Sequence, residues 1–220
     1  MSDCTIVVLL SGRGSNLKSL IVNRQHFKIT SVISDKKDAI GLQIAEESHI
    51  KTEAFPRSEY SSLILQKEAI YGAVRKANPT LVVLAGYMQI VAPHFVNEFR
   101  GRILNIHPSL LPLFGGLRTH ERALQARHTV HGCTVHVLDD GVDTGFIIAQ
   151  ASVPVVAGDD ADILAARVLT EEHKLYPWVI NQIALRNIIV SEDGLKVTFT
   201  QKARDEAVER GFELPLVAPK

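Results

Sequence analysis

The stretch Gly101–Pro112 reads Gly-Arg-Ile-Leu-Asn-Ile-His-Pro-Ser-Leu-Leu-Pro. Its pattern is the main indication of the fold of this chain. Residues 103–106 fit a short buried strand, and Pro108 ends it because proline cannot donate to a strand ladder. Strand side chains alternate between faces, so Asn105 and His107 point to the same face. An amide and an imidazole therefore stand side by side where the strand ends.

That pair of side chains suits acyl-group chemistry. In open α/β sheets, ligands bind at the carboxyl ends of the strands. An asparagine amide can donate to a developing oxyanion, and histidine can carry a proton at neutral pH. Taken singly, His107 and Asn105 also fit structural roles as hydrogen-bonded groups. Asp143, in the acidic and Gly-containing turn 139–145, adds to the pair if the fold brings it close, because a carboxylate favours a charged imidazole and orients it.

A second motif follows the first expected strand. Residues 5–10 form a continuous apolar run, which is typical of a central parallel strand. The segment Ser11-Gly12-Arg13-Gly14-Ser15-Asn16 comes next, and then a helical pattern that Ser15 or Asn16 could cap. A strand, a Gly-rich turn and a helix aim backbone N–H groups at an anion. The third glycine of the dinucleotide fingerprint is absent, so one phosphate is favoured over a pyrophosphate. A tight turn without a ligand is the alternative.

The order of expected elements predicts the fold class. Strands alternate with helices up to about residue 110, which predicts right-handed βαβ units and a mostly parallel sheet. Expected strands at 132–138 and 146–156 add antiparallel neighbours at one edge. The fold class is therefore α/β, a single-domain, doubly wound, mostly parallel sheet with antiparallel edge strands. We assign residues 1–185 to the main domain, and residues 186–220 to a C-terminal hairpin and tail packed on the same domain.

Local sequence patterns predict the buried face of one helix, the cap of another, and a long helix followed by a hairpin. A helix up to Ala77 is expected to bury the stripe Leu63, Ile64, Ile70 and Val74. Thr119 is expected to cap the helix that follows it. A long helix is expected over residues 160–184, with a hairpin over 188–199 after it.

Composition limits the partners and the location. The 24 basic residues equal the 24 acidic ones, so no net field favours nucleic acid or an anionic membrane. No apolar run reaches the ~18 residues of a membrane span, and the N-terminus lacks the pattern of a secretory signal. Cys4 and Cys133 fall in strand patterns and are expected to be buried thiols. We expect a cytoplasmic protein with small-molecule substrates, and the sequence leaves monomer and homodimer open.

Metal binding is not indicated by the histidine pattern. The histidines at 107, 120, 131 and 136 match no usual spacing of zinc ligands. The acidic turn 139–145 lacks the spacing and the closing glutamate of a calcium loop. We therefore expect no metal site.

Several motifs resemble those of the folate-dependent formyltransferases, and within them the enzymes that act on glycinamide ribonucleotide. The resemblance covers about residues 4–180 in the same order. It implies the formyltransferase fold for that part of the chain. The motifs that carry it are Ser11–Leu17, Leu84–Met88, Asn105–Pro112, Thr119–Leu124, Asp143–Gly145 and Glu171–Pro177.

The resemblance implies a one-carbon transfer in purine biosynthesis. The amine of glycinamide ribonucleotide would attack the formyl carbon of 10-formyltetrahydrofolate, the cosubstrate, without a metal. Asn105 and His107 would stabilise the oxyanion, and His107 would carry the proton to the leaving folate nitrogen. Asp143 would poise His107 and hold a water molecule.

The resemblance also implies two binding regions. Residues implied for the ribonucleotide are Gly14, Ser15 and Asn16 at the phosphate, together with Glu172. Residues implied for the folate are Arg57, Met88, Gln89, Ile90, Val91 and Asn105. Two departures affect the fine geometry: Gln89 replaces a basic residue of many members, and the segment 115–118 reads Gly-Gly-Leu-Arg instead of Pro-Gly-Leu-His.

Three alternative functions remain at this point. A tRNA formyltransferase would carry a further nucleic-acid-binding domain and a basic surface. A formyltetrahydrofolate hydrolase would carry a regulatory domain before the first strand. A non-catalytic nucleotide-binding module would use only the turn 11–16, would bind a ligand without turnover, and would leave Asn105 and His107 unexplained.

Overall fold

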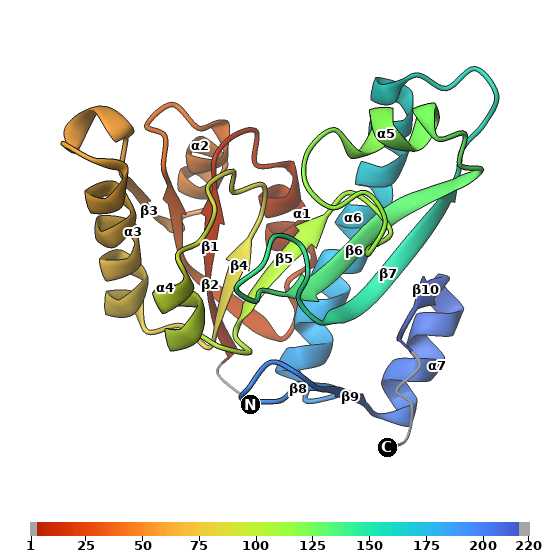
Figure 1. Ribbon diagram of the computed structural model, residues 1–220. Helices are drawn as coiled ribbons and strands as arrows, with labels where there is room; N and C mark the ends of the chain where they lie inside the picture. The colour runs from red at the N-terminus through yellow and green to blue at the C-terminus, as the bar shows by residue number, and fades with distance from the viewer. Residues whose placement is uncertain (1–3, 216–220) are drawn as a thin grey trace.

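A computed structural model describes residues 4–215 of the chain. An eight-stranded sheet with the order β10-β7-β6-β5-β4-β1-β2-β3 forms its centre (Figure 1). The strands are β1 Cys4–Leu10, β2 Phe27–Ser34, β3 Lys51–Ala54, β4 Leu81–Leu84, β5 Ile103–His107, β6 Val130–Val137, β7 Ile147–Pro154, β8 Ile188–Val190, β9 Val197–Phe199 and β10 Phe212–Glu213. The helices are α1 Ser15–Asn23, α2 Ile40–Glu47, the 3-10 helix η1 Arg57–Glu59, α3 Leu63–Ala77, α4 Pro93–Glu98, α5 Thr119–Gln125, α6 Ala161–Ala184 and α7 Gln201–Arg210.

Five strands of the sheet are parallel, as expected. β1 pairs with β2 on one side and with β4 on the other, β2 pairs with β3, and β4 pairs with β5. The chain thus reverses its direction of growth between β1 and β4. Such a switch point leaves a crevice at the carboxyl ends of the two strands, where ligands of doubly wound sheets bind. The loops after β1, β4 and β5 meet at this edge, the upper one in Figure 1.

The other edge of the sheet is antiparallel, which confirms the predicted fold class. β6 runs antiparallel to β5, β7 to β6, and β10 to β7. The pair β8–β9 forms a separate two-stranded sheet at the predicted hairpin. β10 is short, and its Phe212 and Glu213 pair with Ala151 and Gln150 in the middle of β7.

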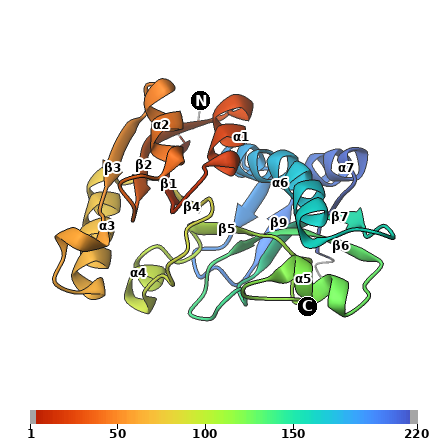
Figure 2. The same cartoon turned by 90° about the horizontal axis from the view of Figure 1, so that it is seen from above.

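Helices cover both faces of the sheet. Figure 2 shows α1, α2 and α6 on one side and α3 and α4 on the other. The long helix α6 supports the strands of the site: Tyr176 is fully buried, and its hydroxyl lies 3.0 Å from the carbonyl oxygens of Leu84 and Leu104. α7 packs Ala203 and Ala207 into the hydrophobic core that also contains Tyr176. Across residues 4–215, no helix combines the length and the apolar character needed to cross a membrane.

One local prediction is wrong in part and another is wrong: Ile70 and Val74 of α3 are buried as predicted, but the first two residues of the predicted stripe are not. Leu63 and Ile64 are 45% and 72% exposed, and the buried stripe of α3 includes Gln66 instead. The Gln66 amide donates to the carbonyl oxygens of Asp35 and Phe55, so a polar residue satisfies distant loops from an interior position. Thr119 does not cap α5, because it is the first helical residue and Arg118 is at the cap, with φ 57°. The predicted buried thiols are confirmed: Cys4 and Cys133 are both free and buried.

Candidate active site

The end of β5 brings three predicted residues together. Asn105 and His107 lie on one face of the strand, while Leu104 and Ile106 pack into the core on the other. The loop between β6 and β7 returns over the end of β5, and Asp143 Oδ2 lies 3.3 Å from His107 Nδ1. The side chains of His107 and Asp143 are only 7% and 13% exposed. Solvent therefore screens the interaction between the imidazole and the carboxylate weakly.

Both ring nitrogens of His107 face oxygen acceptors. Nδ1 faces the Asp143 carboxylate, and Nε2 lies 3.1 Å from the carbonyl oxygen of Phe114. A carbonyl oxygen only accepts, so this contact assigns a proton to Nε2 and leaves Nδ1 facing the carboxylate. Asp143 Oδ2 also accepts the backbone N–H of Gly116 at 2.8 Å. The loop after β5 therefore holds the imidazole and the carboxylate in one network.

The Asn105 amide is oriented by a residue that sequence reasoning missed, His136 on β6. Asn105 Nδ2 lies 3.1 Å from His136 Nε2, and His136 Nδ1 lies 3.1 Å from the Val137 carbonyl oxygen. The carbonyl requires the proton on Nδ1, so a neutral His136 accepts at Nε2 from Asn105. Burial lowers the pKa of His136, in keeping with a neutral ring. One N–H of the Asn105 amide is thereby fixed, and the second can serve an oxyanion.

The position of His136 follows from the strand register. In the antiparallel pair β5–β6, Asn105 lies opposite His136 and His107 lies opposite Thr134. Residues directly opposite each other in such a pair share a face. The alternation of residues 132–138 was visible in the sequence, but the pairing that sets His136 against Asn105 was not.

The Gly-rich turn after β1 opens on the same edge of the sheet. Gly14 has φ 72° and caps α1, and a Cβ at this position would lie 2.5 Å from the Cα of Gly41. Only glycine satisfies both conditions. No side chain caps α1, so the expectation that Ser15 or Asn16 caps it is wrong. The first-turn N–H groups of α1 are left available to a bound anion.

The turn is joined to α6 by a buried contact. Asn16 Nδ2 donates to Glu172 Oε2 at 2.7 Å across 156 residues of sequence. Burial raises the pKa of Glu172, while the Asn16 hydrogen bond and the charge of Arg13 lower it. Asn16 Oδ1 is buried and has no hydrogen-bond partner among residues 4–215. The pair therefore presents acceptor oxygens beside the turn, suited to a ligand with hydroxyl groups.

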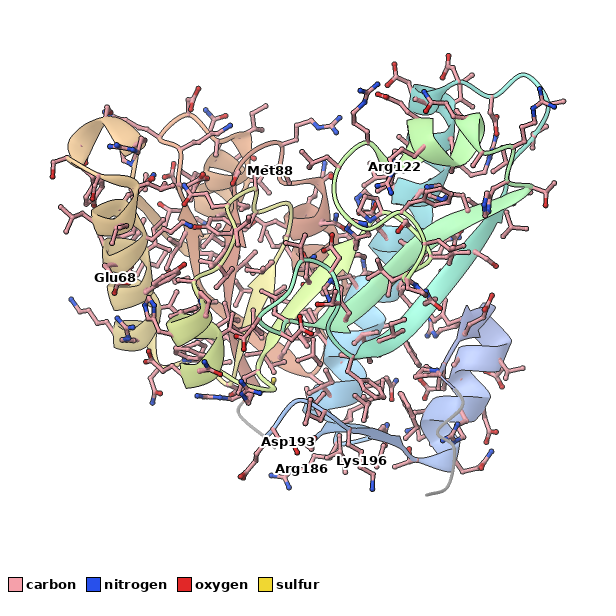
Figure 3. All side chains as sticks on the ribbon, in the orientation of Figure 1. Glu68, Met88, Arg122, Arg186, Asp193 and Lys196 are labelled. Atoms are coloured by element: carbon pink, nitrogen blue, oxygen red, sulfur yellow. The ribbon has the colours of Figure 1, made fainter. Side chains whose placement is uncertain are left out.

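The segment after β4 is placed next to this turn. The Met88 N–H donates to the Ser11 hydroxyl at 2.9 Å. Met88, which is labelled in Figure 3, is 66% exposed, and Ile90 is 68% exposed. Val91 is buried in the core and can offer a ligand little beyond backbone groups. The exposed apolar side chains lie on an edge otherwise lined by polar groups.

Gln89 and Arg57 share a hollow of about 400 Å³ next to this segment. Gln89 Nε2 donates inward, to Asp35 Oδ2 at 3.0 Å and to Gln66 Oε1 at 3.2 Å. The Arg57 guanidinium donates to the carbonyl oxygen of Tyr60. Neither residue contacts the group of Asn105, His107 and Asp143 in the described structure. The hollow therefore forms a separate flank of the site.

Residues 4–180 match the formyl transferase family. The chain belongs to this family. The match begins at β1 and ends within α6, so it includes the residues of the site from Gly14 to Glu172.

Individual formyl transferases resemble most of the chain. Phosphoribosylglycinamide formyltransferase of Escherichia coli is 44% identical over 183 residues, covering 81% of this chain and 86% of that protein. The crystal structure of glycinamide ribonucleotide transformylase 1 from Symbiobacterium toebii superposes with a TM-score of 0.85 at 38% identity, covering 91% of this chain and 95% of that one. The human trifunctional purine biosynthetic protein adenosine-3 is 39% identical over 86% of this chain, which corresponds to 19% of that protein.

This formyl transferase also contains two histidines in contact with each other, His131 on β6 and His120 on α5. His131 is 1% exposed, and its Nε2 lies 3.2 Å from His120 Nδ1. Burial, followed by the charges of neighbouring histidines, lowers the pKa of His131 to about 4. Within residues 4–215, no group of three or more histidine, cysteine or acidic side chains is arranged to hold a metal ion.

The buried pair predicts that acid destabilises the formyl transferase. In the unfolded chain, His131 binds a proton near its ordinary pKa of 6.5. In the folded protein, burial lowers the pKa of His131 to about 4, so it binds the proton only at lower pH. The unfolded state therefore binds more protons between these values, and stability falls as pH is lowered through this window. His131 alone should remove about 2 kcal/mol of unfolding free energy between about pH 7 and about pH 5.

Urea unfolding at several pH values measures this effect. His131→Gln should show a shallower loss of stability on acidification than the unmodified protein, even if it is less stable at neutral pH. His26→Gln, a change at an exposed histidine, should keep the original slope. Equal slopes for all three proteins would contradict the assignment.

Proposed function

We propose that this formyl transferase moves the formyl group of 10-formyltetrahydrofolate to the amine of glycinamide ribonucleotide, giving formylglycinamide ribonucleotide and tetrahydrofolate in purine biosynthesis. The observation that carries the proposal is the convergence of Asn105, His107 and Asp143 at the switch-point edge that also holds the Gly14 turn. The names of the most similar relatives point to the same reaction.

The chemistry follows from the groups present. The amine attacks the formyl carbon, and the carbonyl oxygen takes up negative charge. The free N–H of Asn105 and the positive ring of His107 stabilise that oxygen. Collapse breaks the bond to the folate nitrogen, which gains a proton while the attacking amine loses one. His107 carries this proton, and Asp143 balances the charge of the ring. The proposed reaction needs no metal.

The two substrates are proposed to bind on different sides of the catalytic residues, at the carboxyl edge of the sheet. The ribonucleotide phosphate binds the N–H groups of Gly14, Ser15 and Asn16, and Glu172 accepts from the sugar hydroxyls. The folate lies along Met88, Gln89, Ile90 and Val91, next to Asn105, with Arg57 on its outer side. Gln89 is neutral and is turned toward Asp35, so Arg57, together with Lys36 and Lys37 of the same hollow, supplies the positive charge that can face an anionic part of the folate.

The ribonucleotide assignment predicts the effect of Glu172→Gln. The carboxylate accepts from Asn16 and from substrate, and an amide loses a charge-assisted bond, so the KM for glycinamide ribonucleotide should rise about tenfold or more. The KM for formyl folate should change little. Glu171→Gln is the matched control, because Glu171 pairs with Lys174 on the exposed side of α6. A KM unaffected by Glu172→Gln would contradict this contact.

The activity assay tests the proposal directly. The protein is incubated with 10-formyltetrahydrofolate and glycinamide ribonucleotide, and tetrahydrofolate release is followed. Release that depends on the ribonucleotide supports the proposal. Release without it indicates a hydrolase, release only with tRNA indicates a tRNA formyltransferase, and binding without release indicates a non-catalytic module.

Four further expectations belong to the same proposal. We propose that residues 1–185 form the catalytic domain and that residues 186–220 are an appendage of it. Residues 1–3 and 216–220, at the ends of these ranges, lie outside the described residues. A cytoplasmic location, the absence of a nucleic-acid partner and a monomeric or homodimeric state complete the proposal. Sedimentation of the purified protein measures the last of these.

A further inference from the structure

The loop after β5 hydrogen-bonds the proposed catalytic residues through two backbone groups. The Phe114 carbonyl oxygen accepts from His107 Nε2, and the Gly116 N–H donates to Asp143 Oδ2. The orientation of the imidazole and of the carboxylate thus depends on where two peptide groups of residues 114–116 lie. This segment contains two consecutive glycines, which restrict the backbone little. Something outside the segment must fix it.

The buried Ser109 hydroxyl holds the start of the segment, donating to the Leu113 carbonyl oxygen at 2.6 Å, and Arg122 on α5 makes the contacts that fix the rest. Its Nη1 donates to the Gly115 carbonyl oxygen at 2.6 Å and lies 3.4 Å from the carbonyl oxygen of Leu117 (Figure 3). Its guanidinium carbon lies 5.6 Å from the centre of the Phe114 ring, within range of a cation–π contact. One side chain therefore holds residues 114, 115 and 117, on both sides of the Gly116 N–H.

Aromatic packing completes the support from the same direction. The Phe114 ring meets the rings of His128 and His131 edge to face, with centroids 4.9 and 5.9 Å apart. These rings fix the side chain of Phe114, but they do not reach the carbonyl of Gly115. Only a planar group with several donors can bond the loop carbonyls while covering the ring, which is the geometry of arginine.

We propose that Arg122 is a positioning residue for formyl transfer, which rests on the proposed function. Arg122 holds peptides 114–117 so that the Phe114 carbonyl and the Gly116 N–H set the His107 ring and the Asp143 carboxylate. It touches neither substrate. Its loss should therefore lower kcat and leave both KM values nearly unchanged.

The test compares Arg122→Gln and Arg122→Lys with Arg127→Gln. Arg127 is an exposed arginine just after the same helix, so its variant controls for the loss of a positive charge. Arg122→Gln should lower kcat about tenfold, since it removes a charged donor. Arg122→Lys should retain part of the activity, because it keeps one charged donor and loses the planar fork. Arg127→Gln should behave like the unmodified protein.

A second readout does not depend on activity. Proton NMR of the ligand-free protein with ¹⁵N-labelled histidine reports the Nε2 N–H proton of His107. This proton should be slow to exchange with water in the unmodified protein and in Arg127→Gln. The Nε2 proton should exchange faster in Arg122→Gln, because the carbonyls of Gly115 and Leu117 lose their donor and only a long contact of 3.5 Å from the Ser109 hydroxyl still holds the Phe114 carbonyl. If the unmodified protein lacked formyl-transfer activity, this readout would still test the role of Arg122.

Chemical rescue distinguishes positioning from a general loss of structure. Guanidinium chloride at sub-denaturing concentration should restore part of the kcat of Arg122→Ala, and sodium chloride at equal ionic strength should not. Three results would overturn the proposal: unchanged kcat and unchanged His107 resonances in Arg122→Gln, an equal loss in Arg127→Gln, or a rise in KM without a fall in kcat.

Discussion

Asn105→Ala should lower the turnover of formyl transfer by about 100- to 1000-fold, which is the usual effect of removing one oxyanion donor. The reason is the fixed geometry of this amide, which His136 holds in place from the neighbouring strand. Ground-state contacts to the ribonucleotide lie on other residues, so its KM should change little. Steady-state kinetics with each substrate varied in turn measures both quantities.

The variant needs a check on folding, because it leaves buried His136 without the Asn105 partner. Thermal unfolding and circular dichroism establish that the protein assayed is folded. Asn97→Ala, an exposed change on α4, is the control for asparagine removal. Folded Asn105→Ala with nearly normal turnover would show that another group stabilises the oxyanion.

Asp143→Asn should reduce turnover by about 100- to 10,000-fold, the range in which positioned proton-transfer groups act. The amide has nearly the same shape and can still accept the Gly116 N–H. It lacks the negative charge that faces His107 Nδ1, so the ring has no counter-ion when it carries the second proton during the reaction. The variant thus separates charge from shape.

The pH–rate profile makes this prediction specific to His107. The profile of Asp143→Asn should differ from that of the unmodified protein, because the carboxylate no longer favours the charged ring. Asp140→Asn, in the same turn but 55% exposed beside Arg100, should keep both the rate and the profile. An unchanged profile in Asp143→Asn would remove Asp143 from the mechanism.

The parts of the site that could be predicted from the sequence share one property: they follow from local patterns of apolar and polar residues along the chain. Asn105 and His107 lie on one face because strand side chains alternate, and Pro108 ends the strand. The turn at Gly14 lies at a strand end because a continuous apolar run precedes it. Such inferences need no knowledge of distant contacts.

The parts that the sequence did not predict depend on pairs of distant residues. His136 orients Asn105 through a strand register that no local pattern sets. Gln66 occupies an interior position on α3 although the predicted stripe was apolar, because the carbonyls of Asp35 and Phe55 require its amide. Gln89 turns inward because Asp35 lies within reach across 54 residues of sequence. In each case a polar partner from another element decided the outcome.

The short strand β10 has a consequence for handling the protein. Without it, β7 would be the last strand of the sheet, and its free N–H and C=O groups would be a template for intermolecular pairing. Phe212 and Glu213 occupy the centre of that border, and α7 anchors them there. A chain shortened before α7 would keep every residue of the proposed catalytic centre, yet it would be prone to self-association and precipitation.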